Sequence, residues 1–79
     1  MAEAIETFIQ SDPEIMMGKP VIRGTRISVE LILEKVAAGE SIEQIHQEHP
    51  HVSAEQIRAA LEYATLVFKN DGVHPVGAW

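Results

Sequence analysis

The chain has 79 residues, of which 46% are hydrophobic, and a formal net charge of −6. This length allows one domain, and the apolar content excludes a disordered chain. The negative charge argues against a protein that coats nucleic acid non-specifically, because such binding depends on neutralising phosphates. The absence of cysteine excludes disulfides and thiolate metal sites, which fits the cytoplasmic location that we expect.

Membrane insertion and secretion are not expected either. No apolar run approaches the length that spans a bilayer. The first ten residues contain two glutamates and no basic residue, unlike a secretory signal peptide. A chain this short buries only about 60% of its unfolded surface, so that one core alone is marginal. We therefore expect the chain to form a homodimer, which compensates for the small core.

The N-terminal quarter predicts a β element. Residues 4–9 read as a short strand or extended arm, and residues 11–14 as a turn with a proline. Residues 20–23 read as a second short strand, because proline suits the first position of a strand. Gly24 and Thr25 then form a turn.

Three helices are predicted in the remainder of the chain. The first begins after Ser28 and stops at Gly39; the second begins after Ser41 and is ended by Pro50. The third begins after Ser53 and ends near residues 70–72. A glutamine three residues after the second and third serine predicts capping boxes. Helical spacing predicts a core stripe on the third helix, which consists of Ile57, Ala60, Leu61, Ala64 and Phe68.

The expected fold is therefore α+β and mainly α, with a short N-terminal β element before three helices. Short connections between the helices are typical of a helix-turn-helix. Residues 1–69 would form this domain, and residues 70–79 a flexible C-terminal tail. Tyr63, Leu66 and Val67 widen the apolar surface of the third helix, which predicts that it packs against the core on one side and a partner on the other.

Half of the cations lie in one loop, at Lys19, Arg23 and Arg26, and no acid interrupts them. Such a loop can hold a phosphate or a carboxylate, since arginine binds these groups with two hydrogen bonds. The alternative is structural: Arg23 or Arg26 would pair with Glu30 or Glu34. The glycine and lysine spacing excludes a Walker phosphate loop.

Gln56 and Arg58 lie in the first turns of the third helix, where a recognition helix offers side chains to bases. Glutamine and arginine are residue types that read adenine and guanine edges. The alternative is a solvated face on which Arg58 pairs with Glu62.

Three histidines invite a metal-site hypothesis, but the His-Glu-x-x-His signature is absent, and we expect no metal or other cofactor. Nor does the sequence contain a nucleophile elbow or a cysteine nucleophile. We therefore expect no catalytic residue and no enzyme activity.

Two runs resemble the signature of a known family: Ser-Asp-Pro-Glu-Ile at residues 11–15 and Gly-Lys-Pro-Val-Ile-Arg-Gly-Thr-Arg-Ile at residues 18–27. The chain resembles the small proteins catalogued as domain of unknown function 433 over roughly residues 5–68. The resemblance implies a homeodomain-like helical domain behind a β element. It also implies a VapB-like antitoxin of a type II toxin–antitoxin pair.

The usual partner of such an antitoxin is a nuclease-like toxin of the PIN type, and many also bind their own operator. If operator DNA is bound, the contacts that we expect from the basic loop and the third helix are Lys19, Arg23, Arg26, Gln56 and Arg58. The late apolar residues Leu66, Val67, Val76 and Trp79 are the expected toxin contacts. The alternative is a dimeric protein-interaction module without DNA binding.

Overall fold

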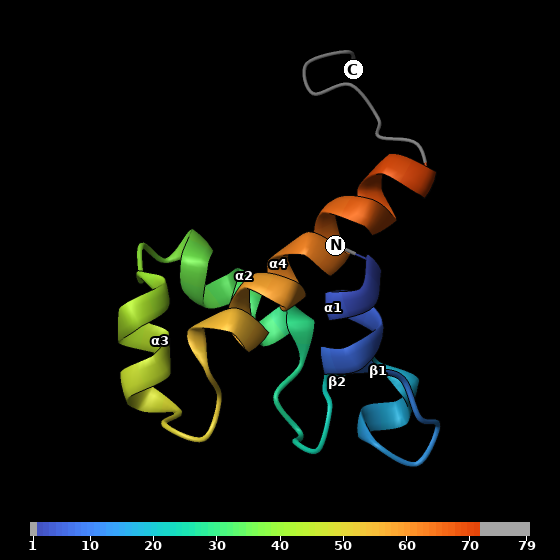
Figure 1. The fold of residues 1–79 in the computed structure, drawn as a ribbon, viewed down its shortest axis with the longest axis horizontal. Coiled ribbons are helices and arrows are strands. Elements are labelled where there is room, and N and C mark those ends of the chain that lie inside the picture. The colour runs from blue at the N-terminus through green and yellow to red at the C-terminus, as the bar shows by residue number, and fades with distance from the viewer. Residues whose placement is uncertain (1, 72–79) are drawn as a thin grey trace.

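A short helix precedes the sheet in the computed structural model, which describes residues 2–71 (Figure 1). The N-terminal part consists of α1 (Ala2–Phe8), β1 (Ile9–Gln10), the 3-10 helix η1 (Met16–Gly18) and β2 (Val21–Ile22). Three helices follow, namely α2 (Val29–Ala37), α3 (Ile42–Glu48) and α4 (Ala54–Asp71). The α+β, mainly helical fold class is thereby confirmed.

The prediction of a strand over residues 4–9 is wrong. Residues 2–8 are helical, and only Ile9 and Gln10 pair with β2, in antiparallel register with Ile22 and Val21. The stretch that became α1 is rich in alanine and glutamate, which have high helix propensity. Its imperfect alternation of apolar and polar residues was therefore a poor indicator of a strand.

The three serine caps lie where the sequence predicts them. Ser28 Oγ accepts a hydrogen bond from Leu31 N at 3.0 Å, which caps α2. Ser41 forms a capping box at the start of α3, and Ser53 forms the same reciprocal pair of bonds with Gln56 at the start of α4. Gly39 follows α2 with φ of +97°, a conformation that favours glycine.

The core lies where α4 meets the other elements. α4 contacts α1, α2, α3 and both strands, and it crosses the molecule diagonally in Figure 1. The largest fully buried side chains are those of Val21, Ile22, Ile32, Ile45, Val52 and Ile57. A β-branched aliphatic core of this kind excludes polar groups and joins the sheet to all three C-terminal helices.

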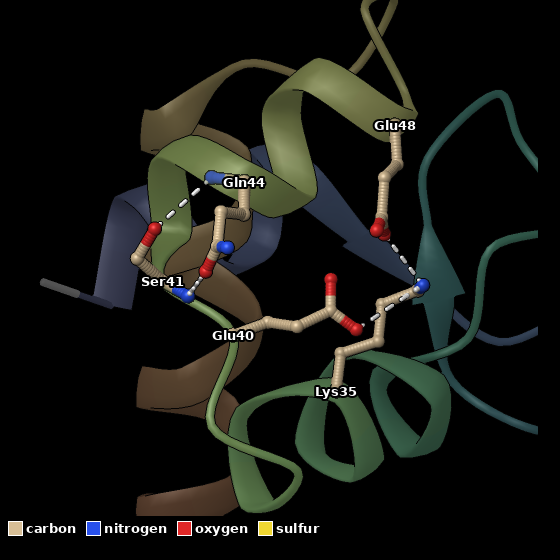
Figure 2. A network of polar contacts seen from close by, with 5 residues as sticks. All are labelled: Lys35, Glu40, Ser41, Gln44 and Glu48. Carbon is tan, nitrogen blue, oxygen red and sulfur yellow. Dashed lines mark hydrogen bonds and ion pairs between the residues drawn. The ribbon is translucent and has the colours of Figure 1, made fainter.

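A polar network fastens α2 to α3 on the surface (Figure 2). Lys35 Nζ on α2 donates to Glu48 Oε1 at the end of α3 at 2.6 Å, and it lies 3.7 Å from Glu40 Oε2. The hydrogen bond to Glu48 raises the pKa of Lys35, and the same bond lowers the pKa of Glu48. Each charge thus stabilises the other across the turn between the two helices.

The predicted core stripe of α4 is too long. Ile57, Ala60 and Ala64 are buried, but Phe68 is 60% exposed, and residues 65–70 are all exposed. The helix itself continues through Asp71, so residues 70 and 71 are helical rather than part of a tail. The rest of the predicted tail, residues 72–79, lies outside the described residues. None of the described helices has the length and hydropathy needed to cross a bilayer.

Candidate functional site

Two of the three loop cations contact other parts of the chain. Lys19 Nζ donates to Glu30 Oε1 on α2 at 2.9 Å, and this bond raises the pKa of Lys19. Arg23 donates from Nε and Nη2 to the carbonyl oxygens of Thr7 and Glu6, at 3.0 and 2.9 Å. Lys19 and Arg23 therefore make contacts within the chain, but not the expected pairing: Lys19 rather than an arginine pairs with Glu30, and Arg23 binds backbone carbonyls.

Arg26 differs from its two neighbours. Its side chain is exposed, and it makes no hydrogen bond or ion pair with any of residues 5–70, whose side chains the structure describes. The turn that carries it is held by Thr25, whose Oγ1 donates to Ile22 O at 2.7 Å and accepts from Ile27 N at 3.0 Å. A rigid turn thus presents one uncommitted cation to solvent.

The two predicted base contacts at the start of α4 differ in their surroundings. Gln56 Oε1 accepts from Ser53 N at 2.7 Å, so its amide oxygen serves the capping box. Arg58, two residues later, is exposed. The alternative pairing of Arg58 with Glu62 is not among the ion pairs of the described residues.

An apolar groove lies between α2 and the second half of α4. It has a volume of about 330 Å³, and its two charged lining residues in the described range are Lys19 and Glu30, which form an ion pair. The other lining residues are Pro20, Val29, Leu33, Tyr63, Ala64, Val67 and Phe68. Apolar side chains that remain exposed in a shared hollow are typical of a binding surface.

A smaller groove lies on the opposite flank of α4, against α1. Its volume is about 170 Å³, and it is lined by Ile5, Glu62, Thr65, Leu66 and Lys69. Glu62 lines this groove, but its Oε2 atom is buried and has no hydrogen-bond partner among the described residues. The two charged residues of the lining in the described range, Glu62 and Lys69, are opposite in sign.

The two predicted toxin contacts that the structure describes are separated by α4. Leu66 lines the α1–α4 groove, whereas Val67 lines the α2–α4 groove. Val76 and Trp79 lie outside the described residues. Phe68 belongs to the predicted core stripe and was missed as a surface residue, because helical periodicity does not reveal where the core ends.

The three histidines in the described part of the chain have separate contacts. His46 Nδ1 lies 2.6 Å from Val52 O, within hydrogen-bonding distance, and the rings of His49 and His51 meet edge to face with centroids 6.2 Å apart. Residues 2–71 contain no group of three or more side chains that could ligate a metal ion. These contacts hold the turn between α3 and α4.

Comparison with known proteins places the middle of the chain in a family. Residues 9–64 match the family described as "Protein of unknown function (DUF433)". A 61-residue stretch, 77% of this chain, is 43% identical to "Uncharacterized protein y4eO" of Sinorhizobium fredii (strain NBRC 101917 / NGR234) and covers 28% of that protein. The chain thus spans less than a third of that relative's length. No solved structure matches this chain. The family match ends at Ala64, the last buried residue of α4 in the described range.

Proposed function

The chain belongs to the DUF433 family, and on that premise we propose that it is the antitoxin of a type II toxin–antitoxin pair, which binds and inhibits a nuclease-like toxin of the PIN type. The observation that carries the proposal is the second half of α4, which continues past the core with exposed apolar side chains over two grooves. A helix that extends apolar surface beyond its own domain is suited to binding another protein.

The net charge of this chain supports a nuclease as its binding partner. Nucleases bind phosphates with cationic side chains, and this chain has a net charge of −6. An acidic inhibitor is steered toward such a surface and can occupy it in place of nucleic acid. In this proposal Leu66 fills an apolar depression of the toxin, while Glu62 in the same groove accepts a hydrogen bond from a toxin cation.

The proposal predicts that a neighbouring gene encodes a PIN-type nuclease, and the test is inhibition of that nuclease. The purified chain should co-purify with that nuclease and suppress its cleavage of RNA, whereas Leu66→Asp should abolish both effects. Met17→Asp is the matched control, because Met17 in η1 is 92% exposed and lines neither groove. Failure of the unmodified chain to bind or inhibit the adjacent nuclease would refute the proposal.

Operator repression belongs to the same proposal and rests on Arg26 and Arg58, the exposed cations of the loop and of the start of α4. The second candidate is a dimeric protein-interaction module that binds no DNA. It is favoured by the intramolecular contacts of Lys19 and Arg23. Titration of the chain with its own upstream DNA, against scrambled DNA of equal length, decides between the two.

A further inference from the structure

Phe68 protrudes beside a hollow on one face of the molecule. Its side chain lines the α2–α4 groove, yet 60% of the residue is exposed. One face therefore carries an apolar projection and an apolar depression side by side. When a twofold axis relates two copies of a face, residue i of one copy contacts residue j of the other and the reverse. Such a face can bury each Phe68 in the other copy's groove.

The charges on this face also suit a second copy of the chain. Two molecules with a net charge of −6 repel each other over most of their surfaces. The α2–α4 groove is an exception, because its charged residues in the described range are one cation, Lys19, and one anion, Glu30. Both are more than half exposed, so a twofold axis can also bring Lys19 opposite the partner's Glu30.

We propose that this chain forms a twofold homodimer in which Phe68 of each copy enters the α2–α4 groove of the other. The occupant of the groove is thus a second copy, and the paired charges of Lys19 and Glu30 in its lining allow two acidic molecules to approach there. Only the exposed 60% of Phe68 is left to be buried in the dimer, and removal of this apolar surface from water stabilises a chain whose own core is small.

The other groove is left for a different partner. The α1–α4 groove is lined by Ile5, Glu62, Thr65, Leu66 and Lys69, and it has no aromatic side chain to exchange with a second copy. The α2–α4 groove contains Phe68, and its charged residues in the described range are one ion pair. The dimer and the toxin contact therefore occupy opposite flanks of α4, and the dimer does not depend on the antitoxin role.

Analytical ultracentrifugation of the full chain tests the interface. The unmodified protein and Met17→Asp should sediment as dimers at about tens of micromolar, whereas Phe68→Asp should sediment as a monomer with an unchanged circular dichroism spectrum. Phe68→Leu should remain dimeric, since it keeps an apolar side chain. A monomeric unmodified protein, or a dimeric Phe68→Asp variant, would overturn the proposal.

Two further variants identify the occupant. Lys19→Glu and Glu30→Lys should each dimerise weakly alone, because like charges then face each other, and their equimolar mixture should form a mixed dimer at low salt. No gain on mixing would contradict the pairing. A chain ending at Asp71 should still dimerise; if it is monomeric, residues 72–79 rather than Phe68 supply the contact. A dimeric protein that fails to inhibit the nuclease would leave this interface intact and refute only the antitoxin role.

Discussion

Arg23 donates from its Nε to the carbonyl oxygen of Thr7, 3.0 Å away and sixteen residues earlier in the chain. Its Nη2 donates to Glu6 O, and its backbone N–H donates to Phe8 O at 2.6 Å. These carbonyl groups belong to the last turn of α1, where they have no partner within the helix. A cation at that end also interacts favourably with the helix dipole. Arg23 thus caps α1 from the far side of the β hairpin.

Replacement of Arg23 should loosen α1. Arg23→Ala should lower the free energy of unfolding by about 1 kcal/mol, the usual net worth of a hydrogen bond, and should speed amide exchange in residues 5–8. Hydrogen exchange with mass spectrometry measures the second effect. Arg26→Ala is the control and should change neither quantity, because Arg26 has no partner in the described range. Unchanged protection of α1 in Arg23→Ala would show that packing alone holds the helix.

Stability should depend on pH through the network of Figure 2. The pKa of Glu48 is lowered in the folded state, so its contribution is present above the ordinary value of 4.5 and is lost as pH falls through the lower, folded pKa. The pKa of Lys35 is raised, so its contribution is present below 10.5 and is lost as pH rises through the higher, folded pKa. Thermal melting at a series of pH values measures both the loss of stability at acid pH and the loss at alkaline pH.

Lys35→Met should reduce the loss of stability at acid pH. The loss of stability at alkaline pH should become smaller but remain, because Glu30 also raises the pKa of Lys19. Glu43→Gln serves as the control, since Glu43 is exposed and forms no ion pair with the described residues. If Lys35→Met melts with the same pH dependence as the unmodified protein, the network contributes nothing to stability.

The cap of α4 should contribute to the free energy of unfolding although it lies on the surface. Ser53→Ala removes the hydroxyl that accepts from Gln56 N at 3.1 Å and should cost about 1 kcal/mol in urea denaturation. Gln56→Ala removes the other half of the capping box. Because the two bonds form one motif, the double variant should lose less than the sum of the single losses. Strict additivity would show that the two bonds act independently.

Any binding of upstream DNA should depend on Arg26 and Arg58. Arg26→Ala combined with Arg58→Ala should weaken binding to all sequences and reduce the salt dependence of log K by about one for each phosphate that is no longer neutralised. Fluorescence anisotropy at several salt concentrations measures this slope. An unchanged slope would place the DNA interface elsewhere. If the unmodified chain binds no DNA, the protein-interaction module is favoured.

Removal of residues 72–79 tests the predicted toxin contacts Val76 and Trp79. The shortened chain should stay folded, because every buried residue in the described range precedes residue 65. It should no longer inhibit the partner nuclease if the C-terminal segment covers part of the toxin. Inhibition equal to that of the full chain would restrict the interface to α4, where Leu66→Asp should still abolish it.

Local features were predictable because their interactions are local. Ser28, Ser41 and Ser53 each bond a backbone N–H three residues later, so that the start of a helix is specified within one turn. Gly39 likewise ends α2 through its own backbone conformation. The order of the three C-terminal helices and the fold class followed from these signals and from the family signature.

Tertiary structure alone decided what depends on distant residues. Helix α1 is held by Arg23, and no local pattern in residues 2–8 indicates that partner. The apolar spacing of α4 continues to Phe68, but burial stops at Ala64, because burial requires a neighbouring element and periodicity describes only one helix. For the same reason the sequence could mark Leu66 and Val67 as apolar surface, while only the packing of α1 and α2 on opposite flanks of α4 placed them in separate grooves.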